Sequence, residues 1–383
     1  MRATRALIHL DNFIHNLKEI RKFSSDKKMC VAVKANAYGH GAVECARAAV
    51  AFGADFLAVA TVEEGIELRE NGITAPLLML SLCDPLEIDD AVKNRITPLV
   101  FDSEYINLFD LSCSKFGVTD FAVHLAIDSG MGRIGCYADE AGDVAQCIKS
   151  SKNLFLQGMC THLCVSDEVS PESIQFTKKQ KEVFLAAIEN VRSRGIDPGI
   201  CHCSNSAAAL NLDDFHMDMV RPGIVCYGYY PGDLTRKYFE EKGVSIDLRP
   251  VMTLETKVSC IKSFCADQSV GYGRTWKACK NTRIAVLPIG YADGMLRSFS
   301  AAGIKVSIKG KQYPVRGRIC MDQCMIDIGN DSNVSRWDTA VIFGDPRYGA
   351  SITADDVANS IGTISYEITS IITKRVERVY LNS

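Results

Sequence analysis

The 383-residue sequence contains no apolar run of the roughly 18 to 20 uncharged residues that a membrane-spanning helix needs. Its formal net charge is only -3, and its lysines and arginines are dispersed, so it has no basic surface to attract nucleic acid or an anionic membrane. The N-terminus lacks the apolar stretch and cleavage site of a secretory signal. We therefore expect a mature cytoplasmic protein that binds neither nucleic acid nor membranes.

The cysteines do not follow the usual metal or disulfide patterns. Sixteen are present, but no two are separated by two residues, the spacing found in many structural zinc sites. Most lie inside apolar segments such as MCVAV and GIVCYG. We expect buried, reduced thiols in a reducing compartment and no metal site.

Three common cofactor and metal motifs are also missing. The sequence has no G-x-G-x-x-G after a strand, no G-x-x-x-x-G-K-[ST] and no H-E-x-x-H. It does have 47% hydrophobic and 23% charged residues, which is enough apolar content for two packed domains and excludes a disordered chain.

Short apolar runs alternate with longer amphipathic segments over the first 230 residues, as in the helical pattern of 177–194. This alternation is typical of parallel strands joined by crossover helices. With an N-terminal run at 6–10 set aside, the number of remaining strands favours a (β/α)8 barrel over an open doubly wound sheet. The eight expected strands are 29–34, 56–60, 76–80, 97–101, 121–127, 154–163, 199–204 and 217–227.

The pattern changes after Gly232. Apolar runs such as VMTLETKVSCIKSF and TRIAVLPIGY are separated there by glycine, aspartate and asparagine turns, which predicts a mostly antiparallel β domain. The final segment, TISYEITSIITKRVERVYL, predicts a short helix followed by a strand. We therefore expect an α/β protein with a TIM-like barrel at 1–240 and a β domain at 241–383.

Lys34 stands where the first strong strand enters a glycine-rich loop, in VAVKANAYGHGAVECARA. In a barrel this end of the strands carries the active site. A partly desolvated lysine has a lowered pKa and can form a Schiff base with an aldehyde cofactor. The alternative interpretation is a strand-end charge that reaches solvent.

Nine motifs, in order along the chain, resemble those of the alanine racemase family of pyridoxal 5′-phosphate enzymes. They are KANAYGHG, IDSGMGRIG, MCTHL, HCSNSAAA, MVRPGIVCYG, VGYGRTW, IGYADG, CMDQCMIDIG and SYEI. The resemblance extends from about residue 6 to residue 380. It implies a cofactor-binding barrel, a C-terminal β domain and a homodimer with shared active sites.

The resemblance makes Lys34 the Schiff-base lysine and the base on one face of the cofactor. It makes Tyr272, in VGYGRTW, the base on the other face, contributed by the partner subunit. Inversion of a stereocentre needs this pair, because a proton leaves one side and another returns from the opposite side. A free tyrosine has a pKa of about 10, so Tyr272 needs positive charge or hydrogen bonds nearby. Without the resemblance, a tyrosine between two glycines is a turn residue.

The resemblance also implies contacts with the cofactor. Arg221 faces the pyridine nitrogen, and since a guanidinium keeps its proton, it leaves that nitrogen largely unprotonated and weakens the electron sink. His162 lies against the ring and links Arg221 to Tyr272. Taken alone, Arg221 is a strand-end arginine paired with Asp214 or Asp218. The phosphate is assigned to Ser206, Gly223, Ile224 and the phenol of Tyr38.

Arg133, in GMGRIG, resembles the arginine that contacts the cofactor's phenolic oxygen and the substrate carboxylate. Many family members have a carbamylated lysine seven residues earlier that positions this arginine, whereas this chain has Ala126. An anion, a water or another side chain then orients Arg133, or the arginine is held less firmly. Around the substrate entrance and carboxylate the resemblance places Tyr291, Met321 and Tyr366, the last also beside the cofactor.

The implied activity is the interconversion of L-alanine and D-alanine, which supplies D-alanine for peptidoglycan. Three alternatives remain: a racemase for serine or a wider range of amino acids, a decarboxylase of similar fold, and a non-catalytic pyridoxal phosphate carrier. The decarboxylases lack the tyrosine of VGYGRTW, and the carriers resemble the barrel alone. Bulky tyrosines over a small pocket favour a methyl side chain, although one hydroxyl changes specificity by only about tens to a hundredfold.

Overall fold

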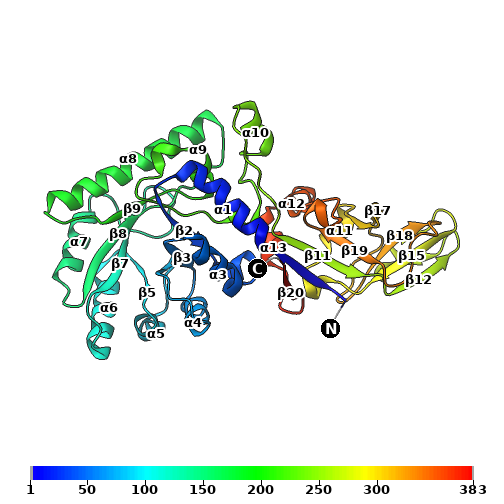
Figure 1. Cartoon of the computed structure of the whole chain (residues 1–383), viewed down its shortest axis with the longest axis horizontal. Helices are drawn as coiled ribbons and strands as arrows, with labels where there is room; N and C mark the ends of the chain where they lie inside the picture. Colours follow the sequence, from blue (N-terminus) through cyan, green and yellow to red (C-terminus); the bar gives the residue numbers. More distant parts are fainter. Residues whose placement is uncertain (1–2, 382–383) are drawn as a thin grey trace.

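The computed structural model describes residues 3–381 and has a barrel at one end of its long axis and β-sheets at the other (Figure 1). Each of the eight strand regions expected in the first part of the sequence contains a strand or a pair of short strands. The barrel strands are β2 (Lys28–Ala32), β3 (Phe56–Val59), β4 (Leu77–Met79), β5 (Ile96–Thr97), β6 (Leu99–Val100), β7 (Phe121–Ala126), β8 (Leu154–Cys160), β9 (Ile200–His202) and β10 (Met219–Val220).

These strands form two parallel ladders, β10-β2-β3-β4-β5 and β6-β7-β8-β9. Pro98 separates β5 from β6 because it has no N–H to donate, while its carbonyl accepts from the His124 N–H at 3.0 Å. At the other seam, the Asp218 N–H donates to the Cys201 carbonyl at 3.1 Å. The two ladders thus form one closed barrel, and the (β/α)8 prediction is confirmed.

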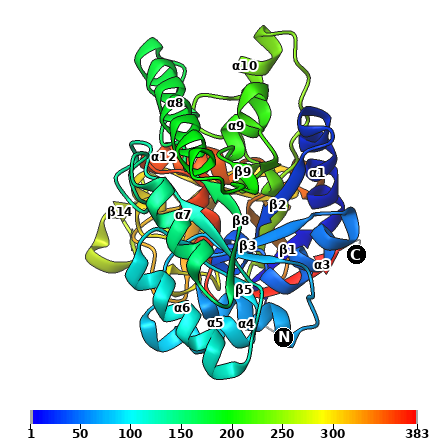
Figure 2. The same ribbon diagram turned by 90° about the vertical axis from the view of Figure 1, so that its left-hand side faces the viewer.

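Helices surround the barrel on its outer side (Figure 2). The helix expected at 177–194 is α8, but it starts earlier, at Pro171, because the Ser170 hydroxyl accepts from the Ser173 N–H and caps its first turn. Phe184 and Val191 lie on its buried face. The longer barrel helices are α1 (Leu10–Ser24), α3 (Ala42–Phe52), α4 (Val62–Glu70), α5 (Ile88–Lys93), α6 (Ser103–Phe116), α7 (Ala141–Ser150), α8 (Pro171–Ser193) and α9 (Ser206–Asn211).

The second part of the structure contains a six-stranded sheet in the order β17-β16-β19-β11-β1-β20, a three-stranded sheet β12-β15-β18 and a β13-β14 hairpin. Its pairs are antiparallel except β1 with β20. The strands are β1 (Arg5–His9), β11 (Met252–Lys257), β12 (Cys260–Phe264), β13 (Ser269–Val270), β14 (Trp276–Lys277), β15 (Thr282–Leu287), β16 (Lys305–Ile308), β17 (Lys311–Pro314), β18 (Cys324–Gly329), β19 (Thr339–Phe343) and β20 (Glu377–Leu381).

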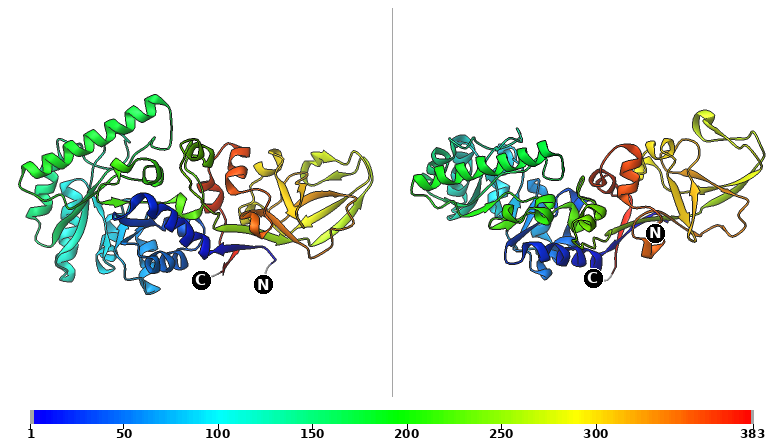
Figure 3. Two further views of the ribbon diagram at one scale, coloured as in Figure 1. Left: turned by 45° about the horizontal axis from the view of Figure 1, so that its top comes forward. Right: turned by 90° about the horizontal axis from the view of Figure 1, so that it is seen from above.

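The N-terminal run that was set aside is β1, which lies in the sheet of the second part, from which α1 leads into the barrel (Figure 3). The remaining α-helices of the described chain are α2 (Lys34–Tyr38), α10 (Arg236–Glu241), α11 (Ser298–Ala301), α12 (Ala354–Ile361) and α13 (Ser365–Ser370). Gly39 lets α2 approach α13, because a Cβ there would lie 2.1 Å from the Thr369 carbonyl oxygen. This contact joins the barrel rim to the second part. No helix within residues 3–381 is long and apolar enough to cross a membrane.

Candidate active site

A cavity of about 370 Å³ opens beside the carboxyl ends of the barrel strands. Such concave sites, with a few converging polar groups, are where small ligands bind. It receives side chains from the loops after β2, β8, β9 and β10, and one from α13. The predicted site residues that line it are Lys34, Tyr38, His162, Ser206, Arg221, Gly223 and Tyr366.

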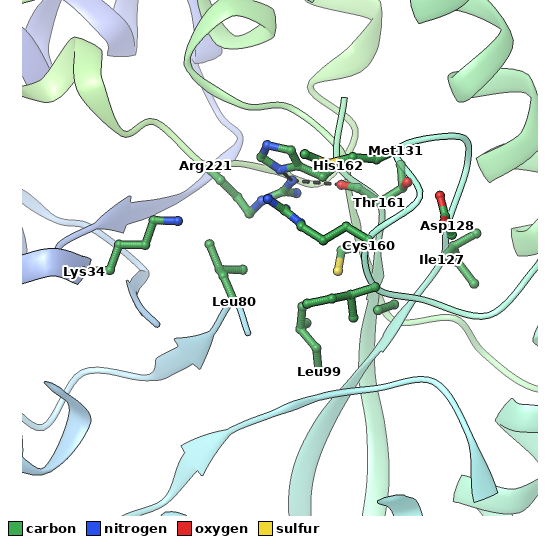
Figure 4. Close-up of a pocket in the computed structure, with 13 residues that line it drawn as sticks. Lys34, Leu80, Leu99, Ile127, Asp128, Met131, Cys160, Thr161, His162 and Arg221 are labelled. Carbon is green, nitrogen blue, oxygen red and sulfur yellow. Dashed lines mark hydrogen bonds between the residues drawn. The ribbon is translucent and has the colours of Figure 1, made fainter. Parts of the chain in front are cut away.

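Lys34 follows the end of β2, and its side chain extends toward Arg221 (Figure 4). Burial lowers the pKa of the Lys34 amine, and the nearby Arg133 and Arg221 cations lower it further, while Glu64 acts in the opposite direction. A larger share of this amine is therefore neutral near neutral pH than of an exposed lysine. A neutral amine can act as a nucleophile or a base.

Arg221 is buried, with 6% of its surface exposed, although its partners are uncharged. One terminal nitrogen donates to His202 Nδ1 at 2.7 Å and the other to the Thr161 carbonyl at 2.9 Å. The alternative of a pair with Asp214 or Asp218 is wrong. Within residues 3–381 no carboxylate pairs with this guanidinium, so the cavity holds a fixed positive charge that favours an acceptor from a ligand.

Asp214 and Asp218 have other partners. The Asp214 carboxylate pairs with the Lys181 amine at 2.7 Å. The Asp218 carboxylate accepts from the Cys201 N–H at 2.8 Å, next to the seam between β9 and β10. Both acids therefore have partners outside the cavity.

Behind Arg221, buried histidines form a hydrogen-bonded chain. Because a guanidinium can donate hydrogen bonds but cannot accept them, His202 accepts from Arg221 at Nδ1 and carries its own proton on Nε2. That proton points to His124 Nδ1 at 2.8 Å, so His124 in turn donates from Nε2 to the side-chain amide oxygen of Gln157 at 3.1 Å. Burial lowers the pKa of His124 to about 4 and that of His202 well below its ordinary value. Both rings are neutral, as acceptance from Arg221 requires.

The sequence analysis missed His124, His202 and Gln157. A signal was present, because His124 interrupts the apolar strand FAVHLA and His202 lies in a predicted strand. A polar residue inside an apolar strand points to a buried partner. Which partner it finds depends on how the barrel closes.

His162 lies beside this guanidinium, with Nδ1 at 3.5 Å from an Arg221 nitrogen. Burial lowers the pKa of His162 to about 3, and the Arg221, Arg133 and Lys34 cations contribute in the same direction. The ring is therefore neutral and lies at the cavity wall (Figure 4).

Hydroxyl and backbone groups converge at the other end of the cavity. The Ser206 hydroxyl accepts from the Gly223 N–H at 2.8 Å. A Cβ on Gly223 would lie 2.6 Å from the Tyr38 hydroxyl oxygen, so glycine leaves room for this approach. The 3₁₀ helix Ile224–Tyr227 starts at the same point, and its first N–H groups have no acceptor within the helix. Such donors suit a phosphate dianion, and the residues fit pyridoxal 5′-phosphate, with Arg221 free to donate to a ring nitrogen.

Asn205, next to Ser206, caps α9, since its side-chain oxygen accepts from the Ala207 and Ala208 N–H groups at 3.1 Å. The Asn205 side chain is therefore occupied as a helix cap. It leaves the Ser206 hydroxyl directed to Gly223.

Arg133 lies in the loop between β7 and α7, which the Asp128 carboxylate holds by accepting from the Gly130 N–H at 2.9 Å and the Gly132 N–H at 3.1 Å. Its exposed side chain lines a smaller, adjoining cavity together with Lys34 and Ala126. Among the residues that the structure describes, none forms a hydrogen bond or ion pair with the Arg133 guanidinium. Within residues 3–381, no other side chain therefore takes the place of the carbamylated lysine, whose position is occupied here by Ala126, in orienting Arg133.

Three predicted residues lie apart from the cavity, on the second part of the chain. Tyr272 is 69% exposed in a 3₁₀ turn within the β13-β14 hairpin, and Met321 is 53% exposed. Tyr291 is exposed close to Met321, because the Ala292 N–H donates to the Met321 carbonyl at 3.0 Å. The structure thus brings Tyr291 and Met321 together. These two residues and Tyr272 all lie outside the cavity that holds Lys34.

Two family models match the chain. The alanine racemase N-terminal domain matches residues 8–231, and the alanine racemase C-terminal domain matches residues 251–380. Together they span both parts of the structure.

Whole-length relatives give the same result. An alanine racemase of Treponema denticola is 48% identical over 385 residues, which cover 100% of this chain and 99% of the relative. An alanine racemase structure from Clostridium difficile is 38% identical with a TM-score of 0.91, covering 100% of this chain and 96% of that one. One from Bacillus anthracis, described with bound L-Ala-P, is 34% identical with a TM-score of 0.91, covering 100% and 96%.

Proposed function

The chain belongs to the alanine racemase family, and we propose that it interconverts L-alanine and D-alanine with pyridoxal 5′-phosphate held by Lys34. The observation that carries this proposal is a half-buried lysine of lowered pKa that shares one cavity with Arg221 and a hydroxyl-lined cradle. The cofactor, when bound, supplies an electron sink that makes the substrate Cα proton acidic. The protein residues then position the substrate and move that proton.

We propose Lys34 and Tyr272 as the two catalytic bases. Lys34 takes or returns the Cα proton on the side of the barrel, and Tyr272 from a second copy of the chain does so on the opposite side. Opposed bases invert the stereocentre, whereas a single base would return the proton to the face that it left. The pKa of the Lys34 amine is lowered by burial, which supports its role as a base.

We propose that Arg221 donates one N–H to the pyridine nitrogen, with His162 against the ring. The neutral chain of His202, His124 and Gln157 orients Arg221 from behind. Because a guanidinium does not release its proton, Arg221 would leave that nitrogen largely unprotonated and the bound cofactor a weaker electron sink. A weaker electron sink would favour racemisation over transamination.

We propose that Ser206, Tyr38 and the N–H groups of Gly223 and Ile224 hold the phosphate, as hydroxyl and amide donors suit a dianion. Arg133 binds the substrate carboxylate. Tyr366, whose ring centroid lies 5.8 Å from that of Tyr38, closes this end of the cavity.

We further propose a homodimer in which the C-terminal β domain of one copy, from residue 241 on, completes the site on the barrel of the other. The exposure of Tyr272, Tyr291 and Met321, away from the cavity of their own chain, supports this arrangement. Met321 then offers its backbone N–H to the carboxylate, and Tyr291 narrows the entrance. A single copy lacks the second base.

We place the enzyme in the cytoplasm, where it supplies D-alanine for peptidoglycan. The sixteen free thiols support this location, because a reducing compartment keeps cysteines unpaired.

The function is tested by incubating the purified protein with L-alanine in deuterated water. We expect deuterium at Cα, followed by NMR, together with D-alanine, followed by chiral chromatography. Serine under the same conditions measures the discrimination, expected at about tens to a hundredfold in favour of alanine. If protein that holds the cofactor gives no deuterium exchange and no D-alanine, the proposal is overturned. Release of carbon dioxide from lysine or ornithine would then support the decarboxylase alternative.

The phosphate cradle gives a second test. Ser206→Ala should weaken pyridoxal phosphate binding about tenfold, because it removes one hydroxyl that hydrogen-bonds a charged group. Ser204→Ala is the matched control, since Ser204 is buried nearby and its hydroxyl has no partner within residues 3–381. The dissociation constant, from equilibrium dialysis, should stay unchanged in the control. Equal constants for both variants would exclude Ser206 from the cradle.

A further inference from the structure

The backbone after Lys34 is strained. Ala35, Asn36, Ala37 and Tyr38 have φ between 52° and 53°, in the left-handed region that side chains other than glycine disfavour. Consecutive residues in this conformation persist only where the surroundings hold them. Something outside the turn must therefore fix the direction in which Lys34 leaves β2.

Glu64, in the first turn of α4, holds the left-handed turn from outside by a hydrogen bond to its backbone. One carboxylate oxygen accepts from the Ala35 N–H at 2.6 Å, and the other accepts from the Ala60 N–H at 2.7 Å. Ala60 follows the end of β3, the strand beside β2. A single carboxylate thus ties the residue after Lys34 to the neighbouring strand, with both oxygens used.

The position of Glu64 is itself determined. Its N–H donates to the Thr61 hydroxyl, the cap of α4, at 3.3 Å. A carboxylate in the first helical turn is also favoured by the helix dipole. The clamp is therefore anchored to a regular element and not to a loop.

Charged groups near the Lys34 amine also shift its pKa. Arg133, in the loop after β7, and Arg221, after β10, lower the pKa of Lys34, whereas Glu64 on α4 raises it. His162, after β8, also faces the amine and is neutral because its own pKa is about 3. Glu64 is the negative charge in this set, so it limits how far burial and the two arginines depress the amine.

We propose that Glu64 is a positioning residue for Lys34, which fastens the left-handed turn to β3 and moderates the cationic field at the amine. The proposal rests on the proposed role of Lys34 as a base. Glu64 touches no reacting atom, and it acts through the backbone of Ala35 and through its charge.

The first experiment compares Glu64→Gln with Glu63→Gln by hydrogen exchange and mass spectrometry on the protein as purified. Glu63 is an exposed carboxylate in the same helical turn that bonds neither Ala35 nor Ala60, so its loss reproduces the change in helix charge and leaves both hydrogen bonds of the Glu64 carboxylate in place. We expect the amides of 35–40 to exchange about tenfold faster in Glu64→Gln, because one charge-assisted hydrogen bond is lost. The control should match the wild type.

The second experiment follows kcat for L-alanine against pH, because a purely structural role would not shift the profile. Loss of the Glu64 charge lowers the amine pKa, so the acidic limb of Glu64→Gln should move to lower pH by about one unit. Glu64→Asp keeps the charge but not the reach. Glu64→Asp should therefore keep the acidic limb of the pH profile at the wild-type position. Its amides at 35–40 should still exchange faster than those of the wild type.

Either unchanged exchange or an unchanged acidic limb in Glu64→Gln would overturn the proposal, and Glu64→Asp repeats the exchange test should Glu64→Gln not fold. If the wild-type protein does not racemise alanine, the proposed function fails. The exchange comparison still decides the role of the clamp in that case, because it needs no activity.

Discussion

Replacement of Lys34 with alanine should lower kcat/KM for L-alanine at least about 10⁴-fold, the combined effect of losing a base and the covalent attachment point. The cofactor's visible absorbance should disappear from the purified protein as well. Among residues 3–381, Lys34 is the lysine that lines the two adjoining cavities, and its amine has a lowered pKa. No other amine in the described cavity lining can take over its role.

Lys28→Ala is the matched control for this variant. Lys28 occupies the other end of the same strand, β2, and its exposed amine lies 3.8 Å from the Asp55 carboxylate. The control should keep both activity and absorbance, measured by chiral chromatography and by spectroscopy. Wild-type racemisation by folded Lys34→Ala protein would remove Lys34 from the mechanism.

Mixing two inactive variants should restore activity. We expect Tyr272→Phe alone to lose about 10² to 10⁴ in kcat, as one proton-transfer group is missing. In a mixed dimer with Lys34→Ala, one site receives Lys34 from one copy and Tyr272 from the other, and is intact. Random exchange of equal amounts should yield about a quarter of wild-type activity, since half the dimers are mixed and each has one working site.

The measurement uses differently tagged variants, dissociated and reassociated together, with mixed dimers isolated by both tags. Each variant reassociated with itself is the control and should remain inactive. Mixed dimers that show no more activity than the controls would mean that Tyr272 does not serve the neighbouring chain. The exposure of Tyr272 would then need another explanation.

The order of the strands follows from local patterns that a single sequence contains. Apolar runs separated by amphipathic segments predicted eight barrel strands, and each one is found where the pattern placed it. The start of α8 was missed by six residues because capping by Ser170, a local contact, extends the helix beyond the apolar periodicity. Element positions are predictable since periodicity and turn residues act over short distances.

Burial of polar groups was less predictable. Arg221 was placed at a strand end from its motif, yet its partners His202 and Thr161 could not be read from spacing, and an aspartate pair was the simplest local alternative. Arg221 and these two partners come from three different strand ends, which meet only when the barrel closes. The contact between Glu64 and Ala35 was equally hard to predict, because the Glu64 carboxylate accepts from the N–H of a residue 29 positions away in the sequence.

Residues close together along the chain were enough to predict the two-part architecture and the motif that places Lys34 at the end of a strand. The groups that surround the Lys34 amine, the left-handed turn that presents it, and the exposed position of Tyr272 outside the cavity of its own chain could be found only in the folded structure. These properties arise from contacts between distant segments, whose geometry is set by barrel closure and by the packing of α13 on α2.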